Sequence, residues 1–175
     1  MTSLYTLAFP LLEHQDAAWI DAFREAHDPQ HAIVATHFTL VFGSDKVSEK
    51  TYLEHVEAVS ASAYPIDFTC RYAMLSTEPG SARGLMFLVP DEGFSGLSLL
   101  HDRLYEGPLS ANLRLDLPFV PHITIGASGD RADARRRCDE LNSRPFCVQG
   151  RVAELVVVAN EGGMLRTIGT YPLAG

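Results

Sequence analysis

Two short segments of the chain, HFTLV at residues 37–41 and HITIG at residues 122–126, carry the same chemically useful pattern. Each reads histidine, apolar, threonine, apolar, and each lies in an apolar stretch typical of a buried strand. Because residues i and i+2 share a face of a strand, each segment presents an imidazole beside a hydroxyl. The side chains concerned are His37, Thr39, His122 and Thr124. Brought together, they would form paired acid–base groups and paired hydrogen-bond donors, which suit chemistry on a phosphate.

Two imidazoles suit the hydrolysis of a phosphate ester, because that reaction needs a base to activate water and an acid to protonate the departing oxygen. The ordinary pKa of histidine, about 6.5, lets one ring be neutral while another is protonated near neutral pH. The threonine hydroxyls can donate to the non-bridging phosphate oxygens, where charge rearranges during the reaction. Which of His37 and His122 acts as the base stays open at this level.

This pattern separates two histidines from the other five in the chain. Only His37 and His122 are followed two positions later by a hydroxyl residue. A single such pair is a weak signal, since threonine is an ordinary strand former, whereas two pairs half a chain apart favour a catalytic site. The remaining histidines are scattered in or beside predicted helices, where we expect surface or capping roles; they are His14, His27, His31, His55 and His101.

Composition limits the class of protein. At 175 residues, 46% hydrophobic and 21% charged, the chain is expected to form a single bilobal domain over residues 1–175. Its 14 basic and 22 acidic side chains give a net charge of −8, which argues against tight binding to long duplex nucleic acid but not against a small phosphorylated substrate. The three cysteines form no CxxC pair, and no signal peptide or membrane span is evident, so we expect a cytoplasmic protein without a membrane partner.

The apolar periodicity predicts the strands and helices that must position the two motifs. Strands are expected at residues 4–9, 32–42, 66–76, 83–89, 113–117, 120–127, 146–158 and 164–171. Helices are expected at residues 13–27, 48–63, 94–106 and 130–141, with a turn at 78–81. In both halves a strand that carries the motif is followed by a helix and a pair of strands. This order has weak internal symmetry, and the mixture of helices and strand pairs indicates an α+β fold.

Paired His-x-Thr motifs on strands of two similar halves resemble the 2H phosphoesterase superfamily, which includes 2′-5′ RNA ligase-like proteins and cyclic nucleotide phosphodiesterases. The family motif is histidine, hydrophobic, threonine or serine, hydrophobic, and proline often precedes it. The stretch from Pro121 to Ile125 fits this motif fully, whereas Thr36 stands where the first motif would have its proline. Phe42, two residues past the first motif, also suits the family pattern.

The resemblance implies a bilobal 2H phosphoesterase fold, in which two pseudo-symmetric lobes with mixed or antiparallel sheets form a central groove and the helices lie outside. It implies a metal-independent phosphodiesterase acting on 2′,3′-cyclic phosphates or related 2′-5′ linkages. His37 and His122 would be its acid and base, and Thr39 and Thr124 would bind the phosphate. No cofactor is expected, and the sequence contains no familiar metal-binding motif. The expected partner is a small nucleotide or RNA end, bound by a monomer.

Four further side chains are candidates for holding the substrate. An aromatic on a strand can stack on a base, and an arginine on a strand can bind a phosphate through paired donors. Each has a plainer alternative, because strand aromatics usually pack in the core and arginines usually face solvent. The candidates are Tyr5, Phe42, Arg71 and Arg83.

Three other functions stay open. The same groups could catalyse the reverse reaction, which joins a 2′,3′-cyclic end to a 5′-hydroxyl RNA end in a 2′-5′ bond. The chain could instead be a non-catalytic module that binds nucleotides or RNA ends without turnover. In a purely structural α+β protein, finally, His37 and His122 would lie far apart on unrelated faces.

Overall fold

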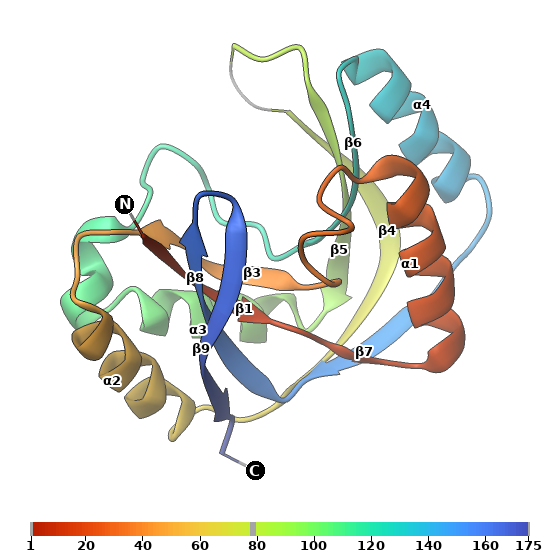
Figure 1. Ribbon diagram of the computed structural model, residues 1–175. Coiled ribbons are helices and arrows are strands. Elements are labelled where there is room, and N and C mark those ends of the chain that lie inside the picture. Colours follow the sequence, from red (N-terminus) through yellow and green to blue (C-terminus); the bar gives the residue numbers. More distant parts are fainter. Residues whose placement is uncertain (1, 78–79, 175) are drawn as a thin grey trace.

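The computed structural model describes residues 2–77 and 80–174, which form an antiparallel sheet flanked by helices (Figure 1). The strands lie in the order β2-β7-β4-β5-β6-β3-β1-β8-β9, and neighbouring strands are antiparallel. Their bounds are β1 (Ser3–Ala8), β2 (Leu11–Leu12), β3 (Phe38–Ser44), β4 (Ile66–Thr77), β5 (Gly84–Glu92), β6 (Ile123–Ser128), β7 (Val148–Val152), β8 (Glu154–Glu161) and β9 (Met164–Pro172). The helices are α1 (His14–His27), α2 (Glu49–Ser60), α3 (Phe94–Leu104), α4 (Arg131–Asn142) and the 3-10 helix η1 (Gly107–Asn112).

The sheet has two halves, which meet where β3 pairs with β6. One half runs outward from β6 through β5, β4 and β7 to β2, and the other runs from β3 through β1 and β8 to β9. At the junction, Phe38 of β3 lies opposite Ile123 of β6. Each half therefore begins at the junction with the strand that follows a motif histidine. This arrangement confirms the expected α+β architecture of two similar lobes.

Two segments of the chain contribute to both halves and curl the sheet. β1 pairs with β3 and β8, and after Pro10 the same segment continues as β2, which pairs with β7. Residues 148–161 pass in the same way from β7 to β8 at Ala153. Figure 1 shows these two segments side by side across the sheet. Because they join its outer strands, the sheet curls into a half-barrel.

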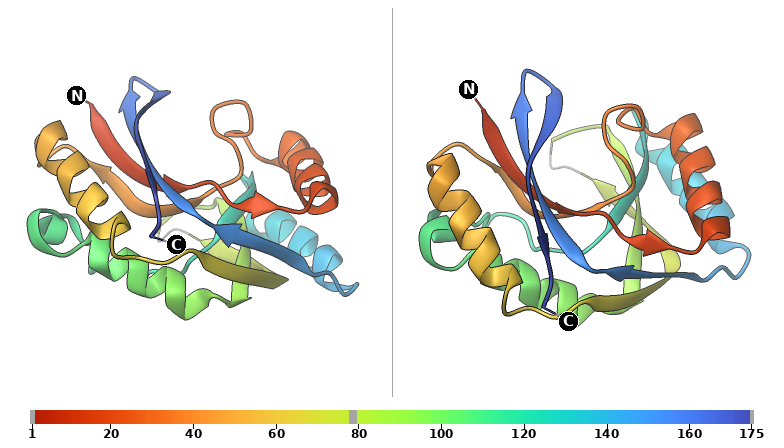
Figure 2. Two further views of the ribbon diagram at one scale, coloured as in Figure 1. Left: turned by 90° about the horizontal axis from the view of Figure 1, so that it is seen from below. Right: turned by 60° about the horizontal axis from the view of Figure 1, so that its bottom comes forward.

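Helices pack against each half and enclose the core. α1 packs on β6, and α4 packs on β4, β5 and β6, whereas α2 packs on β8, β9 and α3. Figure 2 shows α1 and α4 together at one end of the molecule and α2 with α3 at the other. The rings of Phe38 and Phe68 meet edge to face in the buried core, 5.0 Å apart. None of the described helices is long and apolar enough to cross a membrane.

Two helices begin close to where the sequence predicts, each with a side chain that caps its first turn. The Ser48 hydroxyl accepts a hydrogen bond from the Thr51 N–H at 3.2 Å at the start of α2. The Asp130 carboxylate accepts one from the Ala132 N–H at 2.9 Å at the start of α4. Each bond satisfies a backbone donor that the first helical turn leaves unpaired.

Three predicted strands differ in the structure. Residues 32–37 are irregular, because the Val34 carbonyl accepts a hydrogen bond from a side chain rather than from a neighbouring strand. Residues 113–117 are also irregular. Leu115 is 90% exposed, so the alternating apolar side chains of this segment do not pack against the core as those of a strand would. The predicted strand 146–158 is divided at Ala153, where the chain passes from one half of the sheet to the other. Residues 78 and 79 of the predicted turn lie outside the described residues.

Candidate active site

The junction between β3 and β6 determines where both motifs lie. Phe38 and Ile123 are opposite each other in the antiparallel register, and neither side chain is exposed to solvent. Side chains alternate along a strand, so the residue on either side of each of these two points to the other face of the sheet. Those flanking residues are the histidine and the threonine of each motif. All of them therefore face away from the core.

The same register sets the four motif side chains against one another. Continued by one residue in each direction, it places His37 opposite Thr124 and Thr39 opposite His122. Side chains at opposite positions of antiparallel strands have their Cβ atoms about 4.5–5.5 Å apart. All four side chains are partly exposed. The structure thus brings together the two motifs in a two-fold arrangement, in which each imidazole lies beside the hydroxyl of the other motif.

A backbone carbonyl orients each imidazole in the same way. His37 Nδ1 lies 2.8 Å from the Ala35 carbonyl oxygen, and His122 Nδ1 lies 2.6 Å from the Val120 carbonyl oxygen. A carbonyl can only accept, so Nδ1 carries a proton in both rings. In the neutral rings, Nε2 is then an unprotonated acceptor. Both histidines are therefore held in the tautomer that a general base needs at Nε2.

Aromatic side chains support both rings. The His122 imidazole stacks on Phe87 of β5, with ring centroids 3.6 Å apart and planes inclined by 18°. The His37 ring lies 6.1 Å from the ring of Phe9, at a tilt of 58°. These contacts limit the rotation of the imidazoles and remove water from one side of each.

The surroundings lower the pKa of both histidines. For His37 the largest cause is burial, the hydrogen bond to the Ala35 carbonyl opposes it, and the Arg24 charge adds to it. For His122 burial is again the largest cause, and together with the nearby His37 it lowers the pKa to about 4 despite the hydrogen bond to the Val120 carbonyl. Both rings are therefore neutral near pH 7 when no anion is bound, and His122 is the harder of the two to protonate.

The loop before His37 is tied to α1 by a buried arginine that the sequence interpretation missed. Arg24 is 1% exposed, and its Nε–H donates to Asp28 at 2.9 Å. Its Nη2–H donates to the Val34 carbonyl at 2.8 Å, and its Nη1–H donates to the Thr36 hydroxyl at 3.4 Å. The spacing of four residues between Arg24 on a predicted helix and Asp28 just past its end was the available signal, but such pairs usually lie on the surface.

A buried histidine supports the segment before His122. His101 of α3 is 4% exposed and stacks on Phe119, with ring centroids 3.7 Å apart and planes inclined by 13°. The expected surface or capping role is thus wrong for His101, because α3 turns this residue into the core. His55, by contrast, does cap a helix end, since its Nε2 lies 2.9 Å from the Leu104 carbonyl at the end of α3.

The two aromatic candidates for substrate binding lie on neighbouring strands. Phe42 is on β3, is 39% exposed, and donates its backbone N–H to the Tyr105 hydroxyl at 3.0 Å. The Tyr5 ring of β1 lies close to Gly43, where a Cβ would come within 2.6 Å of the ring. Phe42 is thus on the strand that carries Thr39 and Tyr5 is on the neighbouring strand, and their contact with a nucleobase stays a prediction.

The two arginine candidates have different surroundings. The Arg71 guanidinium binds the carboxylates of both Asp91 and Glu92. A phosphate would have to compete with these two carboxylates for its donors. Arg83 is exposed just before β5, where its backbone N–H donates to the Ser81 hydroxyl. Their roles on a phosphate also stay predictions.

A small apolar hollow adjoins His37. Its volume is about 180 Å³, below the range of about 300–1,000 Å³ that encloses a drug-sized ligand. It shares Ala35, the hydrogen-bond partner of His37, and Phe9, the aromatic neighbour of that ring. Apart from one threonine its lining is apolar, and the lining residues are Phe9, Ile33, Val34, Ala35, Val158, Leu165 and Thr167. This space suits one uncharged ring system.

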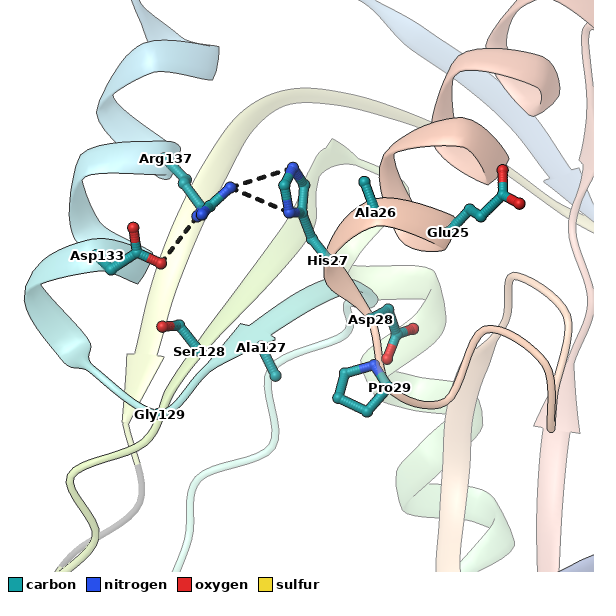
Figure 3. Close-up of a pocket in the computed structure, with 10 residues that line it drawn as sticks. All are labelled: Glu25, Ala26, His27, Asp28, Pro29, Ala127, Ser128, Gly129, Asp133 and Arg137. Atoms are coloured by element: carbon teal, nitrogen blue, oxygen red, sulfur yellow. Dashed lines mark hydrogen bonds and ion pairs between the residues drawn. The ribbon is translucent and has the colours of Figure 1, made fainter.

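A larger cavity of about 490 Å³ lies elsewhere, between the end of α1 and the start of α4 (Figure 3). Arg137 lies across it, binding Asp133 and the ring of His27. None of the four motif side chains lines this cavity. Among the described residues, no three histidine, cysteine, aspartate or glutamate side chains are grouped so that they could hold a metal ion.

Known proteins resemble this chain both in sequence and in fold. A family model described as the 2′-5′ RNA ligase superfamily matches residues 12–164, which include both motifs. The solved structure of Escherichia coli LigT in apo form is 19% identical, with a TM-score of 0.62 over 100% of this chain and 99% of that one. LigT complexed with 3′-AMP is 21% identical, with a TM-score of 0.59 over 99% of each chain.

A third solved structure is more distant in sequence. Usb1 of Kluyveromyces marxianus is 12% identical, with a TM-score of 0.56 over 98% of each chain. No curated protein sequence matches the chain. At these identities the solved structures establish a shared fold, and the family model establishes the relationship in sequence.

Proposed function

The chain belongs to the 2′-5′ RNA ligase superfamily, and we propose that it is a phosphodiesterase that opens 2′,3′-cyclic phosphates of nucleosides or RNA ends. The superfamily relationship agrees with the resemblance to 2H phosphoesterases. The observation that carries the specific proposal is the register of Phe38 and Ile123, which sets each histidine opposite the threonine of the other motif. Two imidazoles in such an arrangement suit a reaction in which one proton is transferred on each side of a phosphorus atom.

In the proposed hydrolysis, one histidine accepts a proton at Nε2 from a water molecule as the water oxygen bonds to phosphorus. The bond between phosphorus and the ribose oxygen on the opposite side breaks. The second histidine, protonated at Nε2, donates that proton to the departing oxygen. Thr39 and Thr124 donate hydrogen bonds to the non-bridging oxygens, which hold more negative charge in the transition state. The product is a ribose phosphate monoester with one free hydroxyl.

The different environments of the two rings support different roles for them. His122, with a pKa lowered to about 4 by burial, is neutral and acts as the base toward water. Burial lowers the pKa of His37 to a smaller extent, and the negative charge of a bound phosphate raises it again. His37 therefore carries the proton that the ribose oxygen receives. In the reverse reaction, which forms a diester, the two rings exchange these roles.

Two observations support a small nucleotide as the substrate. The chain has a net charge of −8, which disfavours the many phosphate contacts that long nucleic acids need. The hollow beside His37 is lined mainly by apolar side chains and has space for one ring system, as a nucleoside would require. Among proteins of the same fold, LigT was solved with 3′-AMP and Usb1 with uridine monophosphate.

The test is hydrolysis of the four nucleoside 2′,3′-cyclic phosphates in the presence of EDTA, by wild type, His37→Ala and His122→Ala. We expect turnover by the wild type that either substitution abolishes while circular dichroism shows an intact fold. Phosphorus NMR of the product shows whether the 2′ or the 3′ oxygen departs. Tight binding of the nucleotides without turnover would instead identify a binding module. Turnover only with a 5′-hydroxyl RNA acceptor would identify a ligase.

A further inference from the structure

Arg24 is a buried charged side chain that the proposed reaction does not use. It lies on α1, 1% exposed, and its carboxylate partner Asp28 is 8% exposed. Removing a charged pair from water is costly, and replacing such a pair by apolar residues is often neutral or stabilising. Stability alone therefore gives a poor reason for this pair. Its remaining contacts point to the loop before His37.

The guanidinium holds the residues on both sides of the carbonyl that orients His37. Nη2–H donates to the Val34 carbonyl at 2.8 Å, and Nη1–H donates to the Thr36 hydroxyl at 3.4 Å. The residue between them, Ala35, accepts the hydrogen bond from His37 Nδ1. Fixing both neighbours of Ala35 fixes the direction of its carbonyl. We propose that Arg24 is a positioning residue that holds His37 in its Nδ1–H tautomer through this loop, an inference that rests on the proposed function of His37.

The second motif achieves the same result by different means. Val120, whose carbonyl orients His122, lies between Phe119, which stacks on His101, and Pro121, which is buried. A proline ring fixes φ, and so stiffens the backbone next to Val120. The first motif has Thr36 in the position of Pro121 and lacks this constraint. The contact from Arg24 to Thr36 restrains the backbone beside Ala35 from outside the loop, as Pro121 restrains the backbone beside Val120.

Arginine suits this role because its donors form a rigid planar fork. The five N–H groups lie in fixed directions, so one guanidinium can bind Asp28, Val34 and Thr36 at once. A lysine has one donor nitrogen on a flexible stem and cannot hold both neighbours of Ala35 in fixed directions. Asp28 also accepts from the Gln30 N–H at 2.9 Å through its other oxygen, which shapes the first turn of the loop.

The decisive variant removes the guanidinium without leaving a buried charge. In Arg24→Met with Asp28→Asn, both charges are absent and the asparagine oxygen can still accept from the Gln30 N–H. The Arg24 charge lowers and the Asp28 charge raises the pKa of His37, so the double substitution removes two opposing charge effects on the ring together. The matched control is Arg151→Met with Asp67→Asn, the same residue types in a solvent-exposed ion pair.

The first readout is nitrogen-15 NMR of the imidazole rings near pH 7. We expect wild type and control to show His37 and His122 protonated at Nδ1. In Arg24→Met/Asp28→Asn we expect His37 to show a mixture of tautomers, while His122 keeps its signals. The second readout is hydrolysis of a nucleoside 2′,3′-cyclic phosphate, where kcat falls by about 10- to 100-fold, the loss typical of removing an orienting partner of a functional histidine. KM changes little, because the phosphate contacts remain.

Two results would overturn the inference. One is a wild-type His37 that is not protonated at Nδ1, which requires no variant to observe. The other is a folded double variant that keeps both the single tautomer and the wild-type kcat. If the double variant does not fold, Arg24→Lys, which keeps a positive charge beside Asp28, is measured by the same criteria. A wild type without turnover, but with the expected tautomers and their loss in the variant, would contradict the proposed reaction and leave the positioning contact standing.

Discussion

Phe38 and Ile123 lie opposite each other at the junction of the two half-sheets, and both side chains are completely buried. This single register relationship puts all four motif side chains on the other face of the sheet. A slip of one residue in either strand would turn its histidine and threonine into the core. The packing of these two apolar side chains is therefore a condition for the site as well as for stability.

Shortening Ile123 should damage both stability and the site. Ile123→Ala removes buried methyl groups at the junction, and we expect the free energy of unfolding to fall by about 2–5 kcal/mol. We also expect kcat to fall, because the two half-sheets meet less closely. Ile123→Val, with a cost of about 0.5–1.5 kcal/mol, should keep most of the activity. Urea denaturation and steady-state kinetics measure both effects, and full activity in a destabilised Ile123→Ala would contradict the link.

Removal of a motif side chain should reduce catalysis without unfolding the protein. His37→Gln and His122→Gln should each lower kcat by about 10²–10⁴-fold, the usual contribution of a positioned acid or base. Thr39→Val and Thr124→Val should each cost about 10²–10³-fold if their hydroxyls stabilise the transition state. His14→Gln, at an exposed histidine on α1, is the control and should be silent. Equal activity in a Thr→Val variant and wild type would remove that threonine from the mechanism.

The stability of the protein should fall in mildly acidic solution. Burial lowers the pKa of His122 to about 4 in the folded protein, whereas the unfolded chain has the ordinary value of about 6.5. Between these values the unfolded state binds more protons, so the free energy of unfolding is fully retained above about pH 6.5 and decreases as the pH falls toward 4. The titration of His122 accounts for up to about 3 kcal/mol of this loss in the free energy of unfolding.

Urea denaturation of wild type and His122→Asn, at several pH values through this window, measures that share. The asparagine does not titrate, so the stability of the variant should depend less steeply on pH. Parallel pH profiles for the two proteins would show that His122 is not protonated upon unfolding, contrary to its burial in the site.

Removing apolar lining from the hollow beside His37 should weaken binding of the nucleoside and leave kcat unchanged. Leu165→Ala removes part of the lining, and a loss of about 1 kcal/mol of apolar contact corresponds to a rise in KM of about fivefold, with kcat unchanged. Leu115→Ala, the same substitution at a residue that is 90% exposed, is the matched control. Ribose 2′,3′-cyclic phosphate, which has no base, should not distinguish Leu165→Ala from wild type. If Leu165→Ala raised KM equally for this compound, the nucleobase would have to bind outside the hollow.

Much of the site could be predicted because its signal is local. Alternation along one strand follows from covalent geometry, so the shared face of His37 and Thr39 can be derived from their spacing. The caps of α2 and α4 are local for the same reason, since Ser48 and Asp130 bind backbone groups within a few residues. The pattern of the two motifs also pointed to the superfamily, whose family model matches residues 12–164.

Other features depend on contacts between segments that are distant in sequence. The residues 32–37 have the composition of a strand, yet the buried Arg24 of α1 binds the Val34 carbonyl and holds the segment as a loop. His101 shares the buried face of α3 with Leu97 and Leu104, and its polar side chain is covered there by Phe119 from a different segment. Neither neighbour is visible in the periodicity of a single segment, because burial of a polar side chain is decided by what packs over it.

The sequence by itself determined the chemical groups of this protein, their pairing within each motif, the α+β class and the superfamily. The tertiary structure decided the register of Phe38 with Ile123, the carbonyl partners of the two imidazoles, and the unequal pKa shifts of His37 and His122. The physical reason is the range of the interactions. Side-chain direction within a strand is set by neighbouring bonds, whereas register, tautomer and desolvation are set by groups that only folding brings together.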